Sequence, residues 1–182
     1  MPLLEFAVLV AGWVAWAVPF FLIRRKGQTA SRIDRRARWG IALTAIGYSV
    51  LWQGKFWERT AEGWQIALSI LFFATASVLS WSATRALGSH WRIDAGLNAE
   101  HQLVMSGPYR VVRHPIYTSM LCQFFATGVL VAPSLLLIAG AVLVFAGTEI
   151  RVRVEDRLLG ERFGDRFQKY QHDVAAYIPF VR

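Results

Sequence analysis

Long stretches without a charged residue dominate the first 148 residues of the chain. Three of these charge-free windows cover residues 6–23, 39–54 and 63–84. Each is close to the roughly 20 residues that a helix needs to cross the hydrocarbon core of a bilayer. The pattern therefore predicts three membrane-spanning helices in the first half of the chain.

A fourth apolar window, residues 115–148, is too long for a single crossing. At about 1.5 Å per residue it would extend roughly 50 Å as one helix, against a hydrocarbon core of about 30 Å. Pro133 and Ser134 stand near its middle. We therefore predict two short spanning helices, about 116–131 and 134–149, joined by a tight turn.

The pattern changes at Glu149, where charged residues begin to alternate with apolar ones in "EIRVRVEDRLLGERFGDRFQKYQ". Apolar positions at helical spacing among charges indicate an amphipathic helix. We expect it to continue the fifth crossing. The predicted fold is an all-α integral membrane protein with about five transmembrane helices and a C-terminal amphipathic helix.

Composition supports a membrane protein. The 182 residues are 55% hydrophobic and have a mean hydropathy of +0.37, which is too apolar for a soluble domain of this size. No repeat or flexible linker divides the sequence, so we expect one membrane domain, 1–182. Composition does change near residue 85, and we expect residues 1–84 to be a three-helix scaffold and residues 85–182 to carry the polar chemistry.

The net charge of +8 could suggest a nucleic-acid partner, but its distribution follows membrane topology. Residues 24–38 hold seven basic side chains against one acidic, whereas residues 55–62 hold two of each. Because basic loops stay on the cytoplasmic side, we expect the N-terminus outside and the segments 24–38, 85–114 and the C-terminal tail in the cytoplasm. No nucleic-acid partner is expected.

Common catalytic and cofactor motifs are missing from the sequence. The four histidines never occur three or four residues apart, which argues against a metal site of the membrane oxygenase kind. The sequence also lacks a GxSxG elbow, a phosphate-binding P-loop and a GxGxxG fingerprint.

One polar segment, "HQLVMSGPYRVVRHPIY" (101–117), lies directly before the fourth predicted crossing. Gly107 and Pro108 predict a turn, and Pro115 fits the first turn of a helix, where its missing N–H has no partner. His114 would then lie at a helix N-terminus, which favours anions. The alternative is that the arginines and tyrosines of this segment are interfacial anchors.

A second polar pair, Arg151 and Glu155, shares one helix face because the two residues are four apart. This could be an ordinary surface ion pair. If the turn at Pro133 is tight, however, the pair lies beside the start of the fourth crossing, and the two polar sets meet. Such a site would open to the cytosol and to lipid, which suits a water-soluble cofactor and an apolar substrate.

Together the two segments resemble the isoprenylcysteine carboxyl methyltransferase family, integral-membrane enzymes related to phospholipid methyltransferases. The resemblance rests on HxLVxxGxYxxxRHPxY (101–117) and RxxxE[ED]xxLxxxFGxxxxxY (151–170), with Asp156 at the position that is often a second Glu. It implies a methyltransferase that uses S-adenosylmethionine without a Rossmann domain. It also implies a lipophilic acceptor, with residues 1–84 providing acceptor access and residues 85–182 forming the cofactor-binding and catalytic core.

The resemblance also assigns site residues. Arg151 would approach the acceptor, and Arg151 and Glu155 would be the catalytic pair. The expected cofactor-binding residues are His101, Gln102, Leu103, Val104, Tyr109, His114, Pro115, Ile116, Tyr117 and Glu155.

Three alternatives stay open at this point. The acceptor could be a phospholipid or a small thiol in place of an isoprenylcysteine carboxyl group. The protein could instead be a membrane reductase that uses a nicotinamide cofactor, or a membrane protein without catalytic activity.

Overall fold

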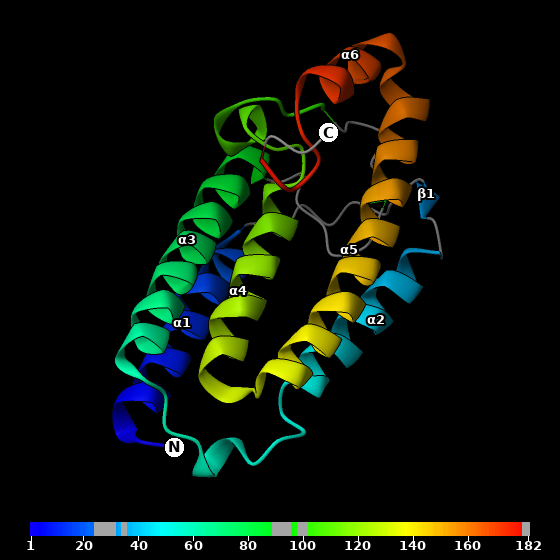
Figure 1. Cartoon of the computed structure of the whole chain (residues 1–182). Coiled ribbons are helices and arrows are strands. Elements are labelled where there is room, and N and C mark those ends of the chain that lie inside the picture. Colours follow the sequence, from blue (N-terminus) through cyan, green and yellow to red (C-terminus); the bar gives the residue numbers. More distant parts are fainter. Residues whose placement is uncertain (24–31, 34–35, 89–95, 98–101, 180–182) are drawn as a thin grey trace.

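A computed structural model describes residues 1–23, 32–33, 36–88, 96–97 and 102–179. Helices dominate this part of the chain (Figure 1). Five of them form the bundle: α1 (Leu3–Leu22), α2 (Ala37–Val50), α3 (Gly63–Leu87), α4 (Pro115–Val131) and α5 (Ser134–Phe163). The smaller elements are η1 (Phe56–Glu58), η3 (Gly107–Arg110), α6 (Asp165–Asp173) and the two-residue strands β1 (Arg32–Ile33) and β2 (Gly96–Leu97), which pair antiparallel.

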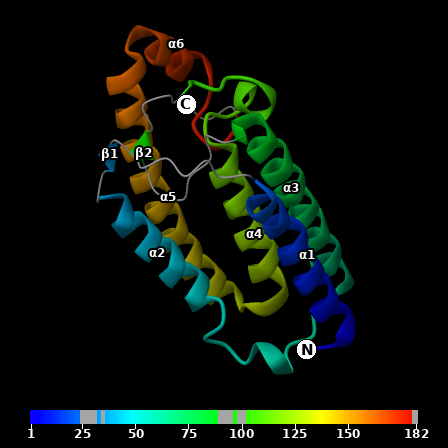
Figure 2. The same ribbon diagram turned by 180° about the vertical axis from the view of Figure 1, so that it is seen from behind.

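The five long helices form two groups. Helix α3 packs against both α1 and α4, whereas α2 packs along α5 (Figures 1 and 2). The N-terminus and η1 lie at one end of the bundle, and η3, α6 and the C-terminal segment lie at the other (Figure 1). We call the latter the polar end.

Three helices, α1, α3 and α5, are long and apolar enough to cross a membrane. Helix α4 is a shorter apolar helix of 17 residues, and α2 has 14 residues, which at 1.5 Å per residue is about 21 Å. The predicted all-α, multi-pass membrane fold is therefore confirmed. The number of five crossings stays a prediction.

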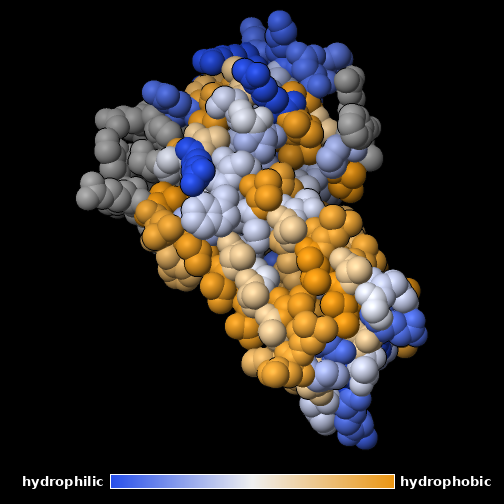
Figure 3. All heavy atoms as spheres, turned by 90° about the vertical axis from the view of Figure 1, so that its left-hand side faces the viewer, coloured by the Kyte–Doolittle hydropathy of each residue, from blue (hydrophilic) through white to orange (hydrophobic). Residues whose placement is uncertain are grey.

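The surface carries an apolar band, with polar residues at both ends of the bundle (Figure 3). Large apolar side chains are exposed on the long helices: Ile70, Leu71 and Val78 on α3, and Leu135, Ile138 and Val142 on α5. Exposed tryptophans lie at both ends: Trp39 at the start of α2, and Trp57 and Trp64 around η1. Tryptophan prefers the interface between membrane and water, so these positions fit the edges of the band.

The predicted turn at Pro133 is confirmed, because Pro133 caps α5 directly after α4 ends at Val131. The fifth helix continues past Glu149 as predicted, but the amphipathic segment forms two helices and not one. Helix α5 ends at Phe163, Gly164 adopts a φ of 52°, and α6 starts as a separate helix at Asp165. A positive φ is favourable for glycine and not for other residues, which explains the break.

Glycines bring α2 and α5 into backbone contact. A Cβ built at Gly147 would lie 2.6 Å from the Gly40 carbonyl oxygen, and one at Gly140 would lie 2.8 Å from the Gly47 carbonyl oxygen. The two glycines on each helix are seven residues apart and so share a face. We call these four residues the glycine seam; close approach of this kind drives helix association in membranes.

Helices α4 and α5 are close together near their connecting turn and farther apart at the polar end. Near the turn, a Cβ at Gly128 would lie 2.4 Å from the Leu137 side chain. At the polar end the same two helices contact each other through long side chains, as in the bond between Arg151 and Tyr117. The two helices therefore form a wedge that widens toward the polar end (Figure 1).

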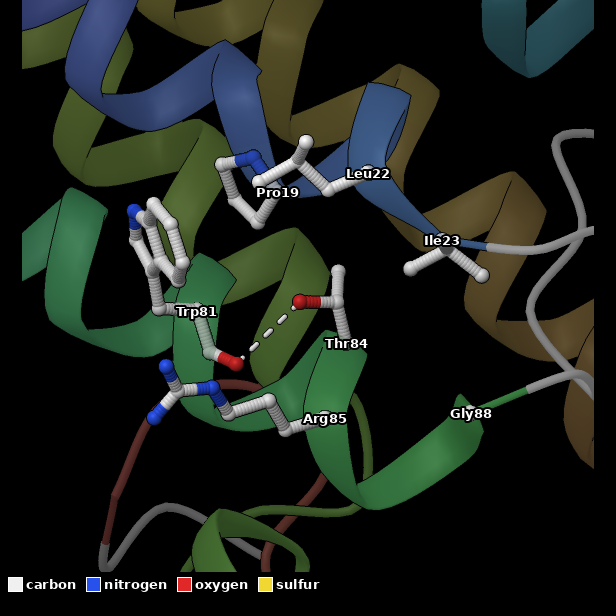
Figure 4. Close-up of a pocket in the computed structure, with 7 residues that line it drawn as sticks. All are labelled: Pro19, Leu22, Ile23, Trp81, Thr84, Arg85 and Gly88. Atoms are coloured by element: carbon white, nitrogen blue, oxygen red, sulfur yellow. Dashed lines mark hydrogen bonds between the residues drawn. The ribbon is translucent and has the colours of Figure 1, made fainter.

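An apolar groove of about 430 Å³ lies between the ends of α1 and α3 at the polar end (Figure 4). None of the predicted site residues lines it. Its lining residues are Pro19, Leu22, Ile23, Trp81, Thr84, Arg85 and Gly88.

Candidate functional site

His114 forms the centre of a buried ionic cluster between the start of α4 and the second half of α5. Its Nε2 lies 2.8 Å from Oδ1 of Asp156, and its Nδ1 lies 3.4 Å from Oε2 of Glu155. The imidazole is buried. The protein therefore holds one histidine between two neighbouring carboxylates of α5.

Arg113 connects the Asp156 carboxylate to the end of α6. Its guanidinium pairs with Oδ2 of Asp156 at 2.9 Å and donates to the backbone carbonyls of Gln171 and Val174. An arginine that donates in several directions fixes the geometry of its partners. Asp156 thus accepts from both Arg113 and His114.

Arg151, Tyr117 and Glu155 form a second group beside this cluster. Arg151 Nε donates to the Tyr117 hydroxyl at 2.7 Å, and that hydroxyl donates to Oε1 of Glu155. The Arg151 guanidinium also lies 5.2 Å from the centre of the Tyr117 ring and 3.6 Å from Glu155. The two polar sets that the sequence predicted to meet are in direct contact.

The opposite charges of the cluster stabilise each other's ionised form. The charged half of α5, from Glu149 onward, lies beyond its apolar part, so His114, Glu155 and Asp156 lie outside the spanning segments. Burial favours a neutral imidazole, but hydrogen bonds to Asp156 and Glu155 outweigh it and raise the pKa of His114 to about 9. Burial likewise opposes charged carboxyls, but the hydrogen bond and charge of His114 lower the pKa of Glu155 and of Asp156. The cluster is therefore ionised at neutral pH.

The segment after α6 closes over the start of α4. The backbone N–H groups of Arg113 and His114 donate to the carbonyls of Ala175 and Ala176, each at 2.8 Å. The Thr118 side chain continues this attachment, because its hydroxyl donates to the backbone carbonyl of Tyr177 at 2.7 Å. We call residues 174–177 the strap.

Tyr177 also connects the strap to α5, because its hydroxyl donates to Oε2 of Glu149 at 3.0 Å. The strap therefore bridges α4 and α5 at the polar end. It fixes the register in which His114 faces Glu155 and Asp156.

The structure describes all but one of the remaining predicted residues. Tyr109 is buried in η3, and its carbonyl accepts from the Tyr170 hydroxyl at 2.6 Å. Pro115 is buried at the first position of α4, as expected, and Ile116 follows it half-buried. Gln102, Leu103 and Val104 lie in the irregular segment before η3, and His101 lies outside the described residues.

Three residues of the cluster and the strap were not predicted as site residues. Asp156 was expected only as a variant of a second Glu, and Arg113 only as an anchor, whereas Tyr177 was not singled out. The sequence could have indicated Asp156, because it directly follows Glu155 and therefore lies at the same end of the bundle. Nothing in the sequence pointed to Tyr177.

A family model matches residues 64–166, more than half of the 182 residues, and its description is phospholipid methyltransferase. The chain belongs to the phospholipid methyltransferase family. The match includes all of α4 and α5 and therefore the ionic cluster that joins them.

The names of two relatives of the chain state two different methyl acceptors. "Protein-S-isoprenylcysteine O-methyltransferase A" of Arabidopsis thaliana is 35% identical over 81 residues, which are 44% of this chain and 41% of that protein. "Methanethiol S-methyltransferase 1" of Bradyrhizobium diazoefficiens is 36% identical over 75 residues, which are 41% of this chain and 25% of that protein. The resemblance to isoprenylcysteine methyltransferases is confirmed, and the matches span less than half of either relative.

Proposed function

We propose that the protein is an S-adenosylmethionine-dependent methyltransferase that acts on a lipophilic acceptor at the cytoplasmic face of a membrane. The contact of Arg151 and Glu155 with Tyr117 carries this proposal. It joins the two motifs of the family resemblance into one site, and the membership of the phospholipid methyltransferase family supports the reaction class.

Glu155 has the right properties to hold the cofactor. Its side chain is 27% exposed, whereas that of Asp156 is 11% exposed. A fixed and accessible carboxylate can accept from the amino group or the ribose hydroxyls of S-adenosylmethionine. Tyr109 and Tyr117 can pack near its cationic and aromatic parts, and the other cofactor positions are His101, Gln102, Leu103, Val104, Pro115 and Ile116.

His114 has a different role from the one that its place at a helix N-terminus suggested. We expected its side chain to meet the carboxylate of the cofactor. Both ring nitrogens instead face Asp156 and Glu155. We therefore propose that His114 holds Glu155 in place for the cofactor.

Arg151 is the proposed acceptor-binding residue. Its guanidinium contacts Tyr117 and Glu155, the residue proposed to bind the cofactor. In this position it can orient an anionic acceptor beside the cofactor. When bound, S-adenosylmethionine supplies a methyl group on a sulfonium. An acceptor carboxylate or thiolate is already nucleophilic, so alignment and exclusion of water matter more than a strong base.

A lipophilic carboxylate is the first candidate acceptor, because the isoprenylcysteine enzymes match over the larger share of both chains. A small thiol or a phospholipid amine is the alternative. The cytoplasmic orientation of the site rests on the basic residues of the polar end, which include Arg36, Arg85 and Arg113.

Calorimetry on the full chain in detergent tests the cofactor. We expect saturable binding of S-adenosylmethionine and S-adenosylhomocysteine and no binding of NADPH. Glu155→Gln should weaken binding at least tenfold. Glu161→Gln is the matched control, because Glu161 pairs with Arg157 on an exposed part of α5 and should bind as the wild type does.

Transfer assays with methyl-labelled cofactor test the acceptor side. Arg151→Gln should lose transfer at least a hundredfold while it retains cofactor binding, and Arg153→Gln, at a 78% exposed position, should keep both. Absence of binding of either methionine derivative would refute the methyltransferase assignment. Binding of NADPH alone would favour the reductase.

A further inference from the structure

A proline near the end of α1 fixes one wall of the apolar groove between α1 and α3. Pro19 has no N–H, so the Ala15 carbonyl, four positions earlier, lacks the hydrogen bond that a regular helix gives it. The indole nitrogen of Trp81 on α3 donates to this carbonyl at 3.0 Å. The Ser80 hydroxyl joins the same two helices, because it donates to the Trp16 carbonyl at 3.1 Å. The Trp81 ring is therefore held in place as a wall of the groove.

Arg85 lies one turn beyond Trp81 on α3 and is held over its ring. The two residues are four apart and share a helix face, and Figure 4 shows their side chains on the same side of α3. The guanidinium carbon of Arg85 is 5.3 Å from the centre of the Trp81 ring. Arg85 is exposed, so its charge is accessible from outside the bundle.

The groove combines an apolar surface with one positive charge. Residues 6–23 hold no charged side chain, and Arg85 is the only charged residue among residues 63–88. None of the seven lining residues is acidic. Two other polar side-chain groups of the lining, the Trp81 indole N–H and the Thr84 hydroxyl, already donate to backbone carbonyls. The groove therefore complements a ligand that is both apolar and anionic.

The groove also lies at the level where a membrane meets water. Helices α1 and α3 are long and apolar enough to cross a membrane, and both end beside the groove, at Leu22 and Leu87 (Figure 4). Tryptophan and arginine are typical of this level, because their apolar parts remain in the hydrocarbon while their polar parts reach the headgroups. The volume of about 430 Å³ is within the range of about 300–1,000 Å³ for small-molecule sites.

We propose that this groove binds a phospholipid with a net negative headgroup. The phosphate contacts Arg85, whose planar guanidinium suits it, and the first part of one acyl chain lies against Pro19, Leu22 and the Trp81 ring. Basic pockets between transmembrane helices bind anionic lipids in this way. A zwitterionic headgroup binds less well, because its cation is repelled by Arg85. None of the proposed cofactor and acceptor residues lines the groove, so this inference does not depend on methyl transfer.

Native mass spectrometry of the full chain, released from detergent micelles, tests the site with two probes. Dioleoylphosphatidylglycerol is net negative, and dioleoylphosphatidylcholine has the same chains with a zwitterionic headgroup. The first molecule of the anionic lipid should bind to the wild type about fivefold more tightly than the first molecule of the zwitterionic lipid, the contribution of one basic side chain at a membrane surface. Arg85→Gln should remove this preference, whereas Arg85→Lys keeps the charge and should retain most of it.

Matched variants separate the groove from the rest of the surface. Arg110→Gln removes an exposed arginine of η3, at the same end of the bundle, that does not line the groove, and it should bind both lipids as the wild type does. Leu22→Trp fills the groove without a change of charge and should weaken the binding of both lipids severalfold. Leu3→Trp adds the same ring at an 83% exposed position at the other end of α1 and should have no effect.

Equal affinities of the wild type for the two lipids would overturn the inference. So would an unchanged preference in Arg85→Gln, which would limit Arg85 to stabilising the C-terminal end of α3. Glycerol 3-phosphate separates a lipid site from a site for free phosphate. We expect no displacement of the anionic lipid by an equal concentration of glycerol 3-phosphate, and displacement would contradict the role of the apolar groove.

Discussion

Helix α5 contacts its two neighbours in opposite ways. Toward α2 it presents the glycine seam, in which Gly140 and Gly147 approach backbone oxygens of the facing helix. Toward α4, at the polar end, it presents Glu155 and Asp156 to His114 at side-chain distance. The seam is a close contact between backbones, whereas the cluster is a contact between ionisable side chains and depends on their protonation. The first contact suits a scaffold and the second suits a binding site.

Removal of one buried charge should have the largest effect on stability. Asp156→Ala leaves His114 and Arg113 without their shared carboxylate, and breaking a buried pair in this way costs about 3–5 kcal/mol. We expect that loss in the free energy of unfolding, measured in mixed detergent micelles. Asp173→Ala, at an exposed residue of α6 that pairs with its neighbour His172, should stay within about 0.5 kcal/mol of the wild type.

The pH dependence should come from the cluster and not from the seam. The pKa of His114 is raised from 6.5 to about 9, so its contribution is complete below about pH 6.5 and is lost as the pH rises through 9. A shift of this size corresponds to roughly 3 kcal/mol. Unfolding measured between pH 6 and pH 10 should show the loss in the wild type. His114→Gln should lack most of it; an equal slope in that variant would contradict this role of His114.

Added volume should damage the seam and leave the pH dependence unchanged. A Cβ at Gly147 would lie 2.6 Å from both the Gly40 carbonyl oxygen and the Thr44 hydroxyl oxygen, so Gly147→Ala forces α2 and α5 apart. Overpacking of this kind costs about 1–3 kcal/mol. The variant should therefore unfold more easily at every pH with the wild-type slope. Gly63→Ala, where nothing lies within 4 Å, is the matched control.

The smallest effect is expected at the strap. Tyr177→Phe removes only the hydrogen bond to Glu149, and a hydrogen bond of this kind contributes about 0.5–1.5 kcal/mol. Cofactor affinity, measured by calorimetry, should fall by a few-fold because the strap positions His114. An affinity equal to the wild type, together with lower stability, would limit the strap to a structural role.

The sequence predicted helices well because charge-free windows report directly on burial in lipid. The fourth and fifth helices end and start within a residue of the expected positions around Pro133. The break at Gly164 was not predicted, because charged and apolar residues continue at helical spacing on both sides of it. The spacing of charged and apolar residues does not indicate where a residue with a positive φ lies.

The candidate site was only partly predictable, for a similar reason. Arg151, Glu155, His114 and Tyr117 carry side chains that suggest chemistry, and they do lie together. The strap attaches through the backbone carbonyls of Ala175 and Ala176, and any residue type supplies such a group.

The strap also has a consequence for biosynthesis. His114 and Tyr117 leave the ribosome some sixty residues before Ala176 and Tyr177, so α4 and α5 can be inserted into the membrane while the start of α4 still lacks its backbone partners. The ionic cluster therefore reaches its final geometry only after residue 177 has been translated. We therefore expect the ionic cluster to form after α4 and α5 have entered the membrane.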